Sequence, residues 1–280
     1  MAIGPALNPP VGGLTLRQEC RIVARMPHDL KFALAGLLVG TLVGFSGMGG
    51  GSVMTPLLIL LGLPANSAVA SDLVYSAITK GVGSISHRQK NNIDWGLSLW
   101  LALGSVPGAV IAVATIGHKL KSDQLQTALG VMLIIAGVAI LYRVLRTIND
   151  NTRQVSFGPV PMTPQRKAIA ISIGFAGGFA VALTSIGSGS VFAIVLMTCF
   201  PIAARRIVGT DIFHATLLLI AASGAQFLLT DNVKIGVVGA LLVGSIPGVL
   251  IGSQFSGKLP ERPLRLALAT VLLVSGSLLV

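Results

Sequence analysis

Two short runs rich in glycine and serine are the most unusual groups of residues in this sequence. The first run is Gly47–Val53 (GMGGGSV), and the second is Ser185–Val191 (SIGSGSV). Each lies in a strongly apolar region, where glycines interrupt helices and let a ligand approach the backbone closely. A helix that begins after such a run presents free N–H groups and the positive end of its dipole, which favour anions. The two runs therefore predict a binding site for a small anion.

The candidate binding residues are the backbone and hydroxyl groups of these runs: Gly47, Gly49, Gly50, Gly51 and Ser52, with Gly187, Ser188, Gly189 and Ser190. A second interpretation is that the glycines only allow close helix packing, as small residues do in membranes. Neither run is a nucleotide-binding motif, because G-x-G-x-x-G after a strand and G-K-[ST] are both missing. Two isolated cysteines and four scattered histidines predict no metal site, no cofactor and no enzyme.

Two acidic residues are the only ones predicted within membrane spans. They are Asp72 and Asp211, and a carboxylate inside a membrane is costly enough to suggest a function. Such a group could carry a coupling proton or help to hold a sodium ion. In the other interpretation each acid lies near the start of its helix and only stabilises the helix dipole.

Two further ionisable residues are candidates for coupling or anion attraction. Lys80 lies seven residues before His87 in a polar loop, so its side chain could either reach the interface or attract an anion. His214 lies beside Asp211 by helical spacing and could titrate near neutral pH. It could equally be a hydrogen-bonded structural histidine.

The composition indicates the environment of these residues. Of 280 residues, 53% are hydrophobic and 10% are charged, and the mean hydropathy is +0.85. Soluble domains have about 25% charged residues. The net charge of +11 does not indicate nucleic-acid binding, because the lysines and arginines lie mainly between apolar runs. We therefore expect an all-α, multi-pass protein of the plasma or inner membrane, with the lipid bilayer as a partner and homo-oligomerisation left open.

Ten apolar segments are predicted to form helices. Their approximate bounds are Leu30–Phe45, Val53–Leu61, Ala68–Ile85, Trp95–Ile116, Leu125–Leu145, Ala168–Thr184, Val191–Phe200, Ala204–Leu229, Gly236–Phe255 and Leu264–Val280. The second segment has nine residues, about 14 Å of helix, whereas the hydrocarbon core is about 30 Å thick. Its glycine run is therefore expected to break a helix or turn a re-entrant hairpin within the membrane.

The segments form an internal repeat with an offset of 138 to 140 residues. Four matches in one order support it: GMGGGSV with SIGSGSV, ASDLVY with GTDIFH, NID with NVK, and GSVPG with GSIPG. The second match aligns Asp72 with Asp211. We expect an N-terminal tail (1–30), a first transmembrane repeat (31–145), a cytoplasmic linker (146–166) and a second transmembrane repeat (167–280). In the tail, Arg17, Arg21 and Arg25 would line one face of a short interfacial helix.

The distribution of positive charge bears on the orientation of the repeats. Without the tail and Lys80, an inverted arrangement places twelve lysines and arginines inside and three outside, whereas a parallel one places eight inside and seven outside. Cytoplasmic loops carry the excess of positive charge, which favours inversion. When Arg17, Arg21 and Arg25 of the tail and the adjacent Lys31 are counted too, both arrangements place twelve positive residues inside and seven outside. Paired broken helices in inverted repeats are typical of the central site of a transporter.

The motifs resemble those of the TauE/SafE sulfite-exporter family over about residues 30 to 280. The stretch that begins at Gly47 (GMGGGSVMTPLLILLGLPANSAVASDL), its weaker copy and the closing GSIPGVLIGSQFSGKLPERPLRLALATVLL carry the resemblance. It implies a secondary transporter, in the exporting direction, for small sulfur-containing anions such as sulfite or organosulfonates. The second run departs from the first, with Ser188 in place of Gly50, and it lacks the proline of MTP. A passive anion channel is the alternative function.

Overall fold

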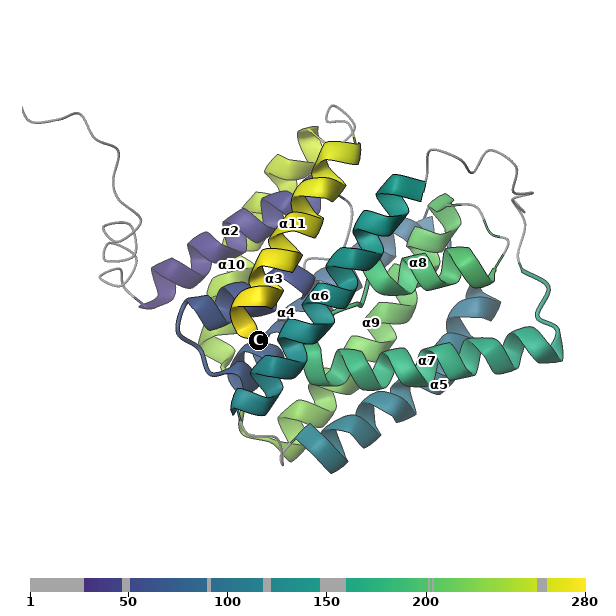
Figure 1. Ribbon diagram of the computed structural model, residues 1–280, viewed down its shortest axis with the longest axis horizontal. Helices are drawn as coiled ribbons and strands as arrows, with labels where there is room; N and C mark the ends of the chain where they lie inside the picture. Colours follow the sequence, from purple (N-terminus) through teal and green to yellow (C-terminus); the bar gives the residue numbers. More distant parts are fainter. Residues whose placement is uncertain are drawn as a thin grey trace, which may run out of the picture.

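The computed structural model describes residues 28–46, 51–89, 92–117, 122–146, 160–200, 202, 204–255 and 261–280, and the regular elements of these residues are helices (Figure 1). The interfacial helix predicted around Arg17 lies outside this part of the chain, as does most of the predicted linker. The helices are α2 (His28–Ser46), α3 (Gly51–Leu60), α4 (Ala65–Gln89), α5 (Trp95–Ala112), the π-helix η1 (Val113–Gly117), α6 (Ser122–Arg146), α7 (Pro164–Thr184), α8 (Ser190–Cys199), α9 (Ala204–Leu229), α10 (Ile235–Phe255) and α11 (Glu261–Leu279).

All ten predicted segments are helical, and α4 departs most from its predicted bounds. This helix has 25 residues, because it continues through polar residues at both ends that a search for apolar runs excludes. Five described helical stretches are long and apolar enough to cross a membrane: Trp95–Gly117, Ser122–Tyr142, Pro164–Thr184, Arg206–Leu229 and Ile235–Gly252. α3 and α8 have ten residues each, about 15 Å of helix, which is half the thickness of a hydrocarbon core.

Glycines join two pairs of helices that are distant in sequence. α2 packs along α10, where Gly36 lies against the Leu241 carbonyl and Gly40 lies against that of Ser245. α5 packs along α7 in the same way, through Gly104 and Gly108. In each pair the contacts advance along both helices together, so the paired helices run parallel. Small residues at such contacts let two backbones approach closely.

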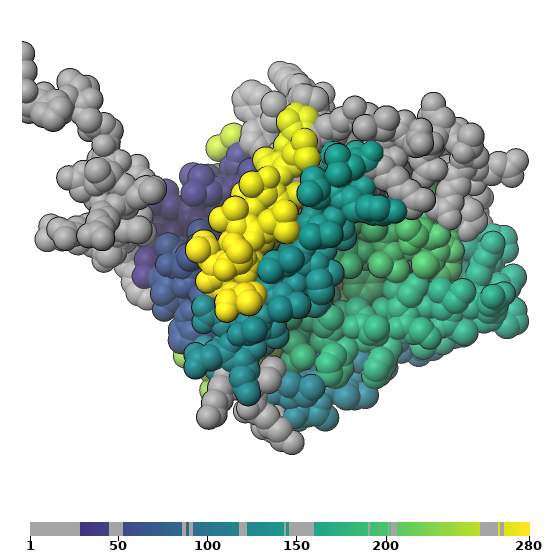
Figure 2. All heavy atoms as spheres, in the orientation of Figure 1, coloured from purple at the N-terminus to yellow at the C-terminus, as the bar shows by residue number. Residues whose placement is uncertain are grey.

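Helices at aligned positions of the two halves pack against each other in opposite directions. In the α4–α9 pair, Gly81 lies near Thr216 and Gly83 near Ile212, so residue numbers rise along one helix as they fall along the other. In the α6–α11 pair, Gly130 contacts Gly276, and Gly137 contacts Leu273 and Ala269. Figure 2 shows α6 and α11 side by side on one face of the molecule.

The buried apolar side chains form two clusters, and α4 contributes to both. The smaller cluster joins α2, α3 and α10 around Phe32, Met54 and Leu241. The larger cluster joins α5 to α9 with α11. α4 supplies Ala68 and Tyr75 to the smaller cluster and Val69 and Leu73 to the larger one. The polar residues of α4 therefore lie between two packed groups of helices.

Candidate anion-binding site

The second glycine run connects α7 to α8 through a buried, non-helical segment. α7 ends at Thr184, and the next residue, Ser185, has a left-handed backbone with φ of 57°. Gly187 and Gly189 follow with φ of 96° and 146°. Residues with a Cβ rarely adopt such angles, which explains why glycines occupy these positions. α8 then begins at Ser190, so the segment leads into a helix N-terminus.

The first glycine run is described only in part. Gly47, Gly49 and Gly50 lie outside the described residues. Gly51 and Ser52 are the first two residues of α3, just as Ser190 is the first residue of α8. The binding roles predicted for these residues stay predictions.

Lys80 extends from α4 to the segment between α7 and α8. Its side chain is 6% exposed, and its Nζ atom donates a hydrogen bond of 2.9 Å to Ser188 Oγ. The side chain therefore does not reach an interface, which was the more usual expectation for a lysine near a helix end. Its charge interacts with those of Asp72 and Asp211. The structure thus brings together residues from three of the predicted groups: the second glycine run, the lysine and the two acids.

The two aligned acids are buried in different surroundings. Asp72 accepts hydrogen bonds from Thr55 Oγ1 (2.5 Å) and Ser76 Oγ (3.1 Å), whereas Oδ1 of Asp211 has no hydrogen-bond partner. Neither acid lies in the first turn of its helix. The interpretation that they stabilise helix dipoles is therefore wrong, because the dipole acts mainly within the first turn.

His214 lies beside the site, on α9. Its Nε2 lies 2.9 Å from Ser105 Oγ on α5, and its ring packs against Phe192 with 4.8 Å between ring centroids. The other ring nitrogen, Nδ1, is buried without a partner. If the serine hydroxyl donates to Nε2, Nδ1 carries the proton of a neutral imidazole and is a free donor.

Unpartnered polar atoms are concentrated in this region. They are Asp211 Oδ1 and His214 Nδ1, both on α9, and Asp211 interacts with the buried charge of Lys80. Buried polar atoms nearly always have a partner in folded proteins. A group of them beside a buried ammonium is typical of a site that binds a polar ligand. The described residues contain no group of three or more His, Cys, Asp or Glu side chains that could hold a metal ion.

Sequence reasoning found the Ser188 hydroxyl but missed other hydroxyl groups of the site and one buried acid. Thr55 and Ser105 gave no sequence signal, whereas Ser76 could have been found from its helical spacing to Asp72. Asp94 is 3% exposed and caps α5: its carboxylate accepts from the backbone N–H groups of Leu97 and Val160. Its partners satisfy it fully, which indicates a structural role.

Comparison with known proteins agrees with the membrane-transporter architecture. The model of the family described as "Sulfite exporter TauE/SafE" matches residues 32–279. The chain is 42% identical over 255 residues to "Probable membrane transporter protein YjnA" of Bacillus subtilis (strain 168), covering 89% of this chain and 98% of the relative. It is 28% identical over 252 residues to "Probable membrane transporter protein YdhB" of the same organism, covering 88% and 98%. No solved structure matches the chain.

These matches span nearly all of the described helices, and they agree with the helices that are long enough to cross a membrane. The relatives are named as transporters, which separates this chain from membrane enzymes. The chain is a multi-pass membrane transporter that belongs to the sulfite exporter TauE/SafE family.

Proposed function

We propose that the protein is a secondary transporter that exports small sulfur-containing anions such as sulfite or organosulfonates. The anion binds between the two glycine-rich segments, near the middle of the membrane. The observation that carries this proposal is the buried Lys80 ammonium, which donates to Ser188 directly before the N-terminus of α8. A small oxyanion at this position would meet a positive charge, hydroxyl groups and backbone N–H groups.

The charges around Lys80 support coupling of the anion to an ion. One ammonium interacts with two carboxylates, so the three groups together carry a net charge of minus one when all are ionised. An anionic substrate is then repelled. Protonation of one acid makes the group neutral, and protonation of both makes it positive. A proton and the anion would therefore travel together through Asp72 or Asp211.

The packing of aligned helices supports an inverted arrangement of the two repeats. α4 and α9 contact each other antiparallel, as do α6 and α11. Aligned helices that run in opposite directions are related by an axis in the membrane plane, which is typical of secondary transporters. The site at Lys80 lies at the α4–α9 contact, so the same residues could face either side when the two groups of helices rock.

Replacement of Lys80 tests the site. We expect Lys80→Met, which keeps most of the unbranched side chain and removes the charge, to weaken sulfite binding roughly tenfold to a hundredfold, because a hydrogen bond to a charged group is lost. The measurement is the sulfite-dependent shift in melting temperature of the purified protein. The same measurement with sulfoacetate, taurine, sulfate and acetate shows which class of anion the protein binds. Lys234→Gln is the matched control, because this lysine is exposed at the start of α10.

An unchanged sulfite affinity in well-folded Lys80→Met would place the anion elsewhere. Ser188→Ala provides a second test that removes only a hydroxyl group. Efflux from proteoliposomes separates the carrier from a channel. A carrier saturates with sulfite and moves it against its gradient when a proton gradient is applied, whereas a passive channel does neither.

A further inference from the structure

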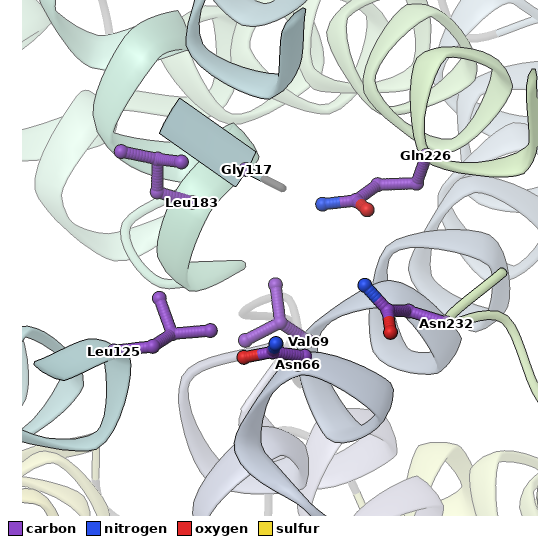
Figure 3. Close-up of a pocket in the computed structure, with 7 residues that line it drawn as sticks. All are labelled: Asn66, Val69, Gly117, Leu125, Leu183, Gln226 and Asn232. Carbon is purple, nitrogen blue, oxygen red and sulfur yellow. The ribbon is translucent and has the colours of Figure 1, made fainter. Parts of the chain in front are cut away.

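A small cavity lies where α4 begins and α9 ends (Figure 3). Its polar lining is the amides of Asn66, Gln226 and Asn232, and the rest of its lining is Val69, Gly117, Leu125 and Leu183. Asn66 precedes Lys80 by fourteen residues, about 21 Å along α4. The cavity is therefore separate from the proposed anion site.

The size of the cavity limits what it can hold. Its volume is about 10 Å³ for the centre of a water-sized sphere, which is room for about one water molecule. Sulfite has four heavy atoms and does not fit. A dehydrated sodium ion is smaller than a water molecule and does.

The hydrogen bonds around the cavity leave oxygen atoms available. Asn66 Oδ1 is buried and has no partner. Thr230 Oγ1 lies 2.7 Å from the Gln226 backbone oxygen and 2.9 Å from its Oε1, but a hydroxyl group has only one proton to donate. Both contacts are satisfied if the Gln226 amide is turned so that Nε2 donates to Thr230. Turning the Gln226 amide exchanges its Oε1 and Nε2 atoms. Figure 3 draws the nitrogen pointing into the cavity, so after the turn the oxygen points there instead.

Helix ends add partial negative charge to the same place. η1 ends at Gly117, α7 ends at Thr184 beside Leu183, and α9 ends at Leu229 one turn after Gln226. The last carbonyl groups of a helix carry the negative end of its dipole. α4, α6 and α10 begin here with the opposite polarity, and the first N–H of α4, at Ala65, already donates to Ser122 Oγ (3.3 Å).

We propose that this cavity is a sodium site, in which the side-chain oxygens of Asn66 and Gln226 and carbonyl groups at the helix ends coordinate the ion. Neutral oxygens suit a hard monovalent cation that must bind reversibly. The contribution of sodium to anion transport rests on the proposed function, whereas the binding of sodium does not. Sodium would then be a second coupling ion, beside the proton proposed for the acids near Lys80.

The test is the melting temperature of the purified full chain, titrated with NaCl against choline chloride at constant ionic strength. A ligand that binds only the folded state raises this temperature as its concentration increases. We expect a rise with sodium and none with choline. Asn66→Ala should raise the half-saturating sodium concentration roughly tenfold or more, and Asn66→Asp should lower it by adding a charge. Asn92→Ala, at the position aligned with Asn232, is the control and should match the parent protein.

Equal melting curves in NaCl and choline chloride would overturn the proposal, and the cavity would then hold only water. A half-saturating sodium concentration that is unchanged from the parent protein in both Asn66 variants would also overturn it. Sulfite binding is measured separately in choline chloride, so failure of the Lys80 site leaves the sodium result unaffected. Sulfite efflux that accelerates with external sodium in the parent protein, and not in Asn66→Ala, would support coupling.

Discussion

At the scale of single residues, the burial of Lys80 has the largest consequence for function. A lysine within two turns of a polar loop commonly extends to the interface, but here it crosses to Ser188, 108 residues away in sequence. A buried ammonium requires partners: Ser188 accepts its hydrogen bond, and the carboxylates of Asp72 and Asp211 lie near enough for their charges to act on it. One residue thereby connects the glycine run of the second half to the acids of both halves.

The aligned acids provide a test of coupling at this scale. If protonation of Asp72 or Asp211 favours anion binding, transport by the parent protein should fall as the pH rises and the acid ionises. Asp72→Asn and Asp211→Asn resemble the protonated acid permanently, so each should weaken or remove this decline. The measurement is the initial rate of sulfite transport in proteoliposomes at a series of pH values.

Other groups that face the two acids define the controls for this experiment. Lys80 and His214 are the neighbouring titratable groups, and Thr55 and Ser76 donate to Asp72. Thr55→Val removes one donor while leaving every charge in place, so transport should still decline as the pH rises, with the midpoint of the decline moved to higher pH because the lost hydrogen bond favours the ionised acid. If both Asn variants keep the parent's rate and pH profile, the acids are structural and the coupling proposal is wrong.

At the scale of elements, glycine contacts determine which helices pair. The Gly244 backbone on α10 lies so close to the Ala33 carbonyl on α2 that no Cβ fits between them. We expect Gly244→Ala to force the helices apart and to destabilise the protein by about 1–3 kcal/mol. The melting temperature in detergent measures this effect.

A matched control lies on the same helix. Gly239 has no atom within 4 Å of a built Cβ, so Gly239→Ala meets no obstacle. Alanine favours a helix over glycine by about 1 kcal/mol, and we expect this variant to be as stable as the parent or more stable. A similar loss of stability in both variants would contradict the role of the close α2–α10 contact.

At the scale of the whole molecule, the orientation of the two halves can be tested from outside the cell. In the inverted arrangement, positions 88 and 206 and the linker face the cytoplasm, while position 121 faces outward. Single cysteines are introduced after Cys20→Ser and Cys199→Ser, since Cys199 is exposed. A membrane-impermeant thiol reagent should label position 121 in intact cells and should label positions 88 and 206 only after permeabilisation. External labelling of 206 but not of 88 would instead support parallel repeats.

The amino-acid sequence by itself determined the helical segments, their membrane character and the alignment of the two halves. These properties depend on local composition and on residue order: an apolar run such as Ala204–Leu229 is a helix in a membrane whatever its neighbours are. The sequence also identified Asp72, Asp211, Lys80 and His214, because ionisable residues are rare inside apolar segments. It did not identify Thr55, Ser76 or Ser105 around them, since serine and threonine are common in membrane helices.

Only the tertiary structure decided which of these residues meet. The Lys80–Ser188 contact, the parallel pairing of α2 with α10 and the cavity between Asn66 and Gln226 all join segments from different halves. Every lipid-immersed helix is apolar, so hydropathy does not distinguish one partner from another. The choice depends on close fits between particular backbones, as at Gly36 and Gly244. It depends equally on the cost of leaving a buried ammonium unpaired, which the folded chain avoids by bringing Ser188 to Lys80.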